Sequence, residues 1–67
     1  MRIVHSDDSV IAFERESDDE TLLCVFNLGE DARDWPTGIA TDGDMMFATD
    51  GADTTTLPPL SGLVLRR

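Results

Sequence analysis

The amino-acid sequence predicts an all-β fold, either a small antiparallel β-sandwich or a single twisted antiparallel sheet of five to seven short strands. Short segments rich in β-branched and aromatic residues alternate with Gly, Pro, Asp and Asn turn residues. No segment with helical periodicity is longer than a turn or two. Because 67 residues give room for only one hydrophobic core, we expect residues 1–67 to form a single domain.

The N-terminal half predicts an antiparallel hairpin that follows a short first strand at Ile3 and Val4. Residues 10–16 are β-branched and aromatic, and residues 17–20 are polar turn formers. Residues 21–28 are the most hydrophobic segment of the chain. Two extended segments joined by so short a polar break are typical of a hairpin.

The second hairpin strand is apolar on both of its faces. The twofold periodicity of a strand places Leu22, Cys24, Phe26 and Leu28 on one face and Leu23, Val25 and Asn27 on the other. Such a strand needs cover on both sides. It is therefore either central in a two-sheet sandwich or part of one sheet whose outer face packs on something absent from this sequence.

The C-terminal half is rich in turn signals, so its strands are expected to be short. Residues 29–34 read as a polar connection, residues 35–38 as a bend, and residues 50–53 as a turn after the apolar group at 45–48. The threonine-rich residues 54–57 favour extended structure, and Pro58 and Pro59 exclude a central strand at their own positions. Residues 62–66 give the last strand.

The composition argues against several classes of partner. Fourteen acidic residues against five basic ones give a formal net charge of −9, which repels nucleic-acid phosphates and anionic lipid headgroups. No apolar run approaches the ~20 residues of a membrane span, and the N-terminal residues lack the apolar region of a signal peptide. We therefore expect no nucleic-acid or membrane partner, and a cytoplasmic location.

The acidic residues do not predict a metal site or a catalytic pair. Asp42, Asp44, Asp50 and Asp53 have spacings that can gather carboxylates on a cation, but a calcium-loop register from Asp42 places apolar residues at the ligand and glycine positions. Ordinary Asp-Gly turns explain them better. We therefore expect no metal, no cofactor and no catalytic residue in this chain.

Three other residues are functional candidates by residue type. Cys24 lies in mid-strand, where a free cysteine usually behaves as a small buried hydrophobe, and His5 has no neighbouring ligand in sequence, which favours a surface position at a strand end. An exposed Trp35 indole can stack on a sugar ring, but structural packing is the favoured interpretation.

Three ordered segments resemble a known family: Val-Ile-Ala-Phe-Glu-Arg at 10–15, Leu-Leu-Cys-Val-Phe-Asn-Leu at 22–28, and Leu-Pro-Pro-Leu-Ser-Gly-Leu-Val-Leu at 57–65. Together they are similar to the C-terminal β-domain of α-glucosidases in the α-amylase family (glycoside hydrolase 13). The opening residues 1–4 are similar to the short strand that precedes the first segment. The resemblance is weak from about residue 29 to residue 56.

The resemblance implies a non-catalytic C-terminal accessory domain. In that family an aspartate and a glutamate on the loops of a (β/α)₈ barrel cleave the α-glucosidic bond. A barrel needs on the order of 250 residues, so none of those residues can be placed on this chain. The implied partner is a catalytic barrel in the same protein, on which this domain packs.

Two alternatives remain open at the level of sequence. One is a stand-alone β-module that binds a glucan through Trp35, and the other is such a module that binds a protein partner through an apolar face. A homodimer through that same face is the corresponding oligomeric expectation.

Overall fold

A computed structural model describes residues 1–49 and 51–67 and confirms the all-β prediction. The described residues form seven strands, which in chain order are β1 (Arg2–Ser6), β2 (Val10–Glu16), β3 (Thr21–Asn27), β4 (Arg33–Asp34), β5 (Asp44–Ala48), β6 (Thr56–Leu57) and β7 (Ser61–Arg66). Within the described residues there is no helix, and so none that is long and apolar enough to cross a membrane.

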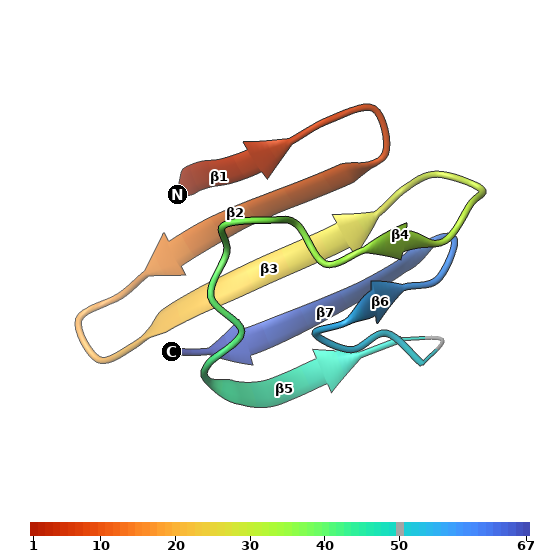
Figure 1. Ribbon diagram of the computed structural model, residues 1–67. Helices are drawn as coiled ribbons and strands as arrows, with labels where there is room; N and C mark the ends of the chain where they lie inside the picture. The colour runs from red at the N-terminus through yellow and green to blue at the C-terminus, as the bar shows by residue number, and fades with distance from the viewer. Residues whose placement is uncertain (50) are drawn as a thin grey trace.

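Five strands form one antiparallel sheet in the order β1-β2-β3-β7-β5, and β4 pairs with β6 in a second, two-stranded sheet (Figure 1). The predicted hairpin is confirmed, since β2 and β3 pair over their full lengths, from Val10 opposite Asn27 to Glu16 opposite Thr21. The last strand, β7, inserts beside β3, so the most apolar strand is central.

The structure differs from the sequence-based expectation in the connections. The expected polar connection at 29–34 contains strand β4, whose Arg33 pairs with Leu57. Both residues of β4 are polar and exposed, so only this long-range pairing defines the strand. Strand β6 is shorter than expected because the Asp53 side chain accepts the backbone N–H groups of Thr55 and Thr56 and turns the chain there. Asp50 lies outside the described residues.

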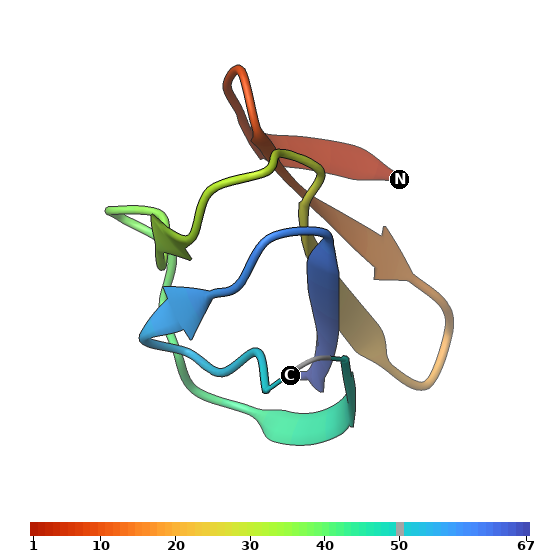
Figure 2. The same ribbon diagram turned by 90° about the vertical axis from the view of Figure 1, so that its right-hand side faces the viewer.

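The hydrophobic core lies between the five-stranded sheet and the segment that carries the small sheet. Both β4 and β6 lie on the same side of the large sheet (Figure 2). The core consists of Val10, Ala12, Leu23, Val25, Ala52, Leu57, Leu63 and Leu65, with Val4, Trp35 and Ile39 packed against it. We call the side of the large sheet that carries Ala12, Leu23, Val25, Leu63 and Leu65 the core face.

Asn27 joins the end of β3 to the chain between β6 and β7. Its side chain is fully buried, and its amide donates to the carbonyl oxygens of Leu57 (2.9 Å), Asp31 (2.8 Å) and Pro58 (3.2 Å). Its Oδ1 accepts the backbone N–H of Gly29 at 3.0 Å. The side chain therefore satisfies buried backbone groups that the two prolines and the short strands leave unpaired.

The edges of the large sheet are the strands β1 and β5 (Figure 1). Each contains an irregularity in its pairing, between Ile3 and His5 in β1 and between Met45 and Phe47 in β5. Bulges of this kind interrupt the regular row of backbone groups at an edge and hinder pairing with another chain.

Candidate functional site

The candidate site is the side of the large sheet opposite the core face. Directly paired residues of neighbouring strands project to the same side, and one such row crosses all five strands. The row consists of Ile3, Phe13, Cys24, Val64 and Phe47, in strand order β1, β2, β3, β7 and β5. We call this side the outer face. Every residue of its central row is apolar.

A second row of the outer face is also apolar and contains an aromatic pair. Ile11 pairs with Phe26, and Phe26 pairs with Gly62. A Cβ atom added at Gly62 would overlap the Phe26 ring, so the glycine lets the ring lie flat across β7. The Phe13 and Phe26 rings stack with their centroids 6.1 Å apart. Close packing among these rings fixes the shape of the face.

Charged residues occur at one end of the outer face. There Arg15 pairs with Leu22, Leu22 with Arg66, and Arg66 with Asp44. Arg66 lies 3.8 Å from Asp44 and 4.0 Å from the Glu20 carboxylate. The outer face is thus apolar at its centre and ion-paired at this end.

Two leucines extend the apolar surface at the opposite end of the strands. Leu28 and Leu60 are 66% and 67% exposed, and the Leu60 N–H donates to the carbonyl of Gly29. Leu60 has φ of 54°, a left-handed conformation that is unfavourable for a leucine. Contacts inside this domain do not explain why an exposed, strained position carries a large apolar side chain.

The family model of the maltogenic amylase C-terminal domain matches residues 1–64. The chain belongs to this family. A search of curated proteins found no match. The family is that of an accessory domain of amylase-type glycoside hydrolases, which occurs with a catalytic domain in the same chain. This agrees with the family that the three sequence segments indicated.

The second and third of the segments that resemble the family share a structural role. The Asn27 amide that ends the second segment bonds to the Leu57 and Pro58 carbonyls that begin the third. This contact joins two residues, Asn27 and Leu57, that are 30 positions apart in the sequence. Sequence reasoning recognised both segments but not the bond between them, because side-chain pairing over such a distance has no local signal.

Cys24 and His5 are not brought together. Cys24 is 8% exposed on the outer face, and burial raises the pKa of its thiol, which disfavours the reactive thiolate. His5 pairs with Ala12, a residue of the core face, so the two side chains lie on opposite sides of the sheet. The prediction that Cys24 is a buried strand residue is confirmed.

The aspartates weighed for a cation have other contacts. Asp42 lies 3.2 Å from Arg67, Asp44 lies 3.8 Å from Arg66, and Asp53 accepts two backbone N–H bonds. Those two bonds lower the pKa of Asp53. In the part of the chain that the structure describes, no three His, Cys, Asp or Glu side chains are grouped to hold a metal ion. Asp50, the fourth candidate, lies outside that part.

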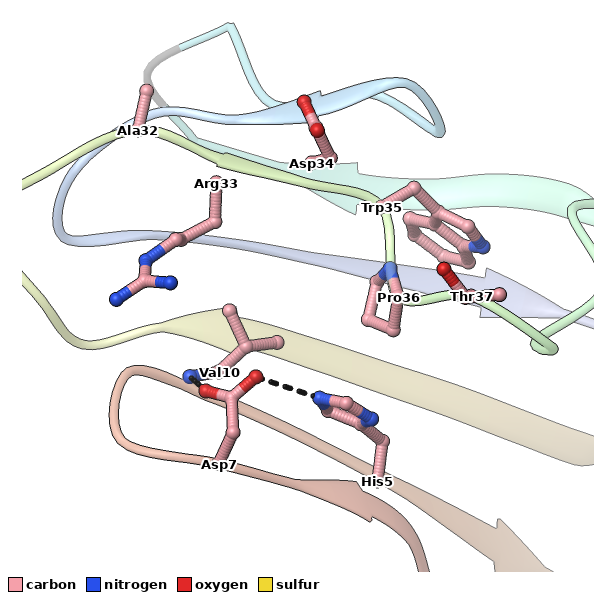
Figure 3. Close-up of a pocket in the computed structure, with 9 residues that line it drawn as sticks. All are labelled: His5, Asp7, Val10, Ala32, Arg33, Asp34, Trp35, Pro36 and Thr37. Carbon is pink, nitrogen blue, oxygen red and sulfur yellow. Dashed lines mark hydrogen bonds and ion pairs between the residues drawn. The ribbon is translucent and has the colours of Figure 1, made fainter.

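Trp35 has a structural role, as predicted, and also borders a groove. Its ring packs against the core, and its indole N–H donates to the carbonyl of Ile39 at 2.8 Å. The groove encloses about 340 Å³ between the β1–β2 hairpin and the chain at 32–37 (Figure 3). It lies on the core-face side of the sheet, away from the outer face.

Proposed function

We propose that this chain is the non-catalytic C-terminal accessory domain of an α-glucosidase-like glycoside hydrolase. Its outer face packs on the (β/α)₈ barrel that cleaves α-glucosidic bonds, and this packing stabilises the barrel. The observation that carries the proposal is the apolar row across all five strands, from Ile3 to Phe47, on a face that none of the strands in the described residues covers. Family membership supports the identity of the partner.

The size of the outer face fits this role. Ile3 and Phe47 are each 57% exposed, and Leu28 and Leu60 are 66% and 67% exposed. Taking about 200 Å² for a large side chain, these four leave roughly 500 Å² accessible, and the half-buried members of the two rows raise this to about 700 Å². One partner in a stable protein interface contributes about 800 Å². Apolar patches of this size on soluble domains usually mark contact sites.

Several carboxylates of this chain are already engaged in structure, which supports a non-catalytic role. Asp7 and Asp53 cap turns, and Asp42 and Asp44 face arginines. A glycosidase pair instead needs two carboxyl groups of unlike pKa on either side of a substrate bond. We expect the purified chain to leave p-nitrophenyl α-glucoside intact, and turnover that follows the chain through purification would refute the proposal.

Packing on a barrel can be tested by mixing this chain with a separately prepared barrel. The probe is an amylase-family barrel prepared without its own C-terminal domain, and the readout is the midpoint of its thermal unfolding. We expect the chain to raise that midpoint, and we expect Ile3→Glu and Phe47→Glu to abolish the effect by burying a charge in the contact. Thr37→Glu, an exposed position on the other side of the sheet, is the matched control. Equal stabilisation by the outer-face variants would contradict the proposal.

A second copy of the chain could pack on the same face and bury a similar area. In the absence of a barrel we therefore expect concentration-dependent self-association, measured by sedimentation equilibrium. Phe47→Glu is expected to remain monomeric. If this variant self-associates as strongly as the wild type, the contact between copies lies on another surface.

A further inference from the structure

The turn between β6 and β7 presents a leucine in a conformation that leucine rarely adopts. Pro59 and Leu60 form this turn, and Leu60 has φ of 54°. When proline is the first central residue of a turn, a positive φ at the second is usually found with glycine or asparagine. A leucine in this conformation is strained. Burial within the domain does not offset the strain, because the Leu60 side chain is 67% exposed.

Hydrogen bonds on both sides of the turn hold its backbone in place. The Asn27 amide and the Ser61 hydroxyl both donate to the carbonyl oxygen of Pro58, at 3.2 Å and 2.6 Å. The Leu60 N–H donates to the carbonyl oxygen of Gly29 at 3.2 Å. Because the backbone is already fixed, little conformational entropy is lost when the Leu60 side chain enters a partner.

Leu28 adds a second exposed leucine beside Leu60. It is 66% exposed and directly precedes Gly29, whose carbonyl accepts the Leu60 N–H. The β3–β4 and β6–β7 connections that carry the two leucines meet at the same end of the large sheet (Figure 1). Leu28 follows Phe26 by two positions, so the leucines continue the apolar outer face beyond the ends of the strands.

We propose that Leu60, with Leu28 beside it, is the anchor of the docking contact and inserts into an apolar pocket on the surface of the catalytic domain. A few well-packed side chains carry most of the energy of a protein interface, and strained residues persist where they serve a contact or a function. The family that this chain matches occurs with a catalytic domain in the same protein, which makes that domain the partner of choice. The inference rests on the proposed function and adds to it the residues and the pocket.

The strain distinguishes an anchor from a residue that the fold needs. Asparagine tolerates positive φ better than leucine does, and the exposed Leu60 side chain loses little burial when it is replaced. We therefore expect Leu60→Asn to raise the thermal midpoint of the isolated chain by about 3–6 °C. The same variant should bind the catalytic domain about 10–100-fold more weakly, which is the factor that full burial of a leucine side chain contributes.

The binding test is a calorimetric titration of an amylase-family barrel, prepared without its own C-terminal domain, with the chain and its variants. Leu60→Met keeps an apolar side chain of similar volume and should bind about as tightly as the wild type. Thr37→Asn introduces the same amide at an exposed position on the other side of the sheet and is the matched control. It should leave binding unchanged.

Four results would overturn the proposal. A lower thermal midpoint for isolated Leu60→Asn would show that the leucine serves the fold, and barrel binding by Leu60→Asn equal to that of the wild type would show that it anchors nothing. An equal loss of binding in Thr37→Asn would remove the assignment to this turn. If Leu60→Asn weakens only the self-association of the chain, the pocket belongs to a second copy.

Failure of this inference is distinguishable from failure of the proposed function. If the wild-type chain does not bind the barrel, both are refuted. If Phe47→Glu loses binding while Leu60→Asn binds as the wild type does, the outer face is the docking surface and only the anchor is refuted.

Discussion

Replacing Asn27 by alanine should destabilise this domain more than any exposed substitution. The side chain is fully buried and makes bonds to backbone groups of two separate segments, at Gly29 and Asp31 in the β3–β4 connection and at the Leu57–Pro58 pair. The substitution leaves those groups without their partner and leaves a small cavity in their midst.

The expected loss is about 3–4 kcal/mol. The amide has two hydrogens and one carbonyl oxygen, so it supplies about three bonds, each contributing about 1 kcal/mol net, and the cavity adds a smaller amount. A chain of 67 residues has roughly 3–10 kcal/mol of total stability. The variant should therefore be close to its unfolding transition at room temperature.

Urea unfolding followed by Trp35 fluorescence measures this loss, because Trp35 packs against the core. With a urea dependence of about 1 kcal/mol per molar for so small a chain, the midpoint should fall by about 3 M. Asp31→Ala is the control, since it keeps the backbone carbonyl that Asn27 contacts and changes only an exposed side chain. A midpoint shift in Asn27→Ala as small as that of the control would refute the role given to Asn27.

Two further predictions concern local conformation and pH. Gly43 has φ of 126°, and an added Cβ would lie 2.8 Å from the backbone oxygen of Arg66, so Gly43→Ala should lose about 2–3 kcal/mol in thermal melts. Gly38→Ala, with φ of 90° and open space around it, should lose only about 1 kcal/mol. Two backbone N–H groups and the His5 ring hold the pKa of Asp7 well below its ordinary value, so its charge stabilises the fold above about pH 4 and less as the pH falls further. The difference in urea midpoint between wild type and Asp7→Asn should accordingly shrink from pH 6 to pH 2, and a constant difference would contradict this assignment.

The strands that sequence reasoning found are those with a local signal. Residues 10–16 are apolar and β-branched, and β2 has these bounds in the structure. Strand β4 has no such signal, because Arg33 and Asp34 form a strand only through their pairing with β6. The left-handed conformation of Leu60 also could not be predicted from the sequence, because leucine rarely adopts positive φ.

The candidate site was predictable only in part. The alternation of β3 correctly separated Leu22, Cys24 and Phe26 from Leu23 and Val25, but it did not say which side the chain itself covers. That outcome depends on the segments at 33–39 and 51–57, which cover the core face through tertiary contacts. The groove is formed by the same tertiary contacts, so its lining residues could not be predicted from the sequence. Only Trp35 among them was named as a candidate for sugar stacking.

The central claim is that the outer face contacts a catalytic barrel, and methyl resonances of the isoleucines test it most directly. The chain has isoleucines at three positions: Ile3 and Ile11 on the outer face, and Ile39 in the segment at 33–39 against the core. When an amylase-family barrel lacking its own C-terminal domain is added to the methyl-labelled chain, we expect the Ile3 and Ile11 signals to shift or broaden while Ile39 stays unchanged. Unchanged Ile3 and Ile11 signals, or a change confined to Ile39, would contradict the account.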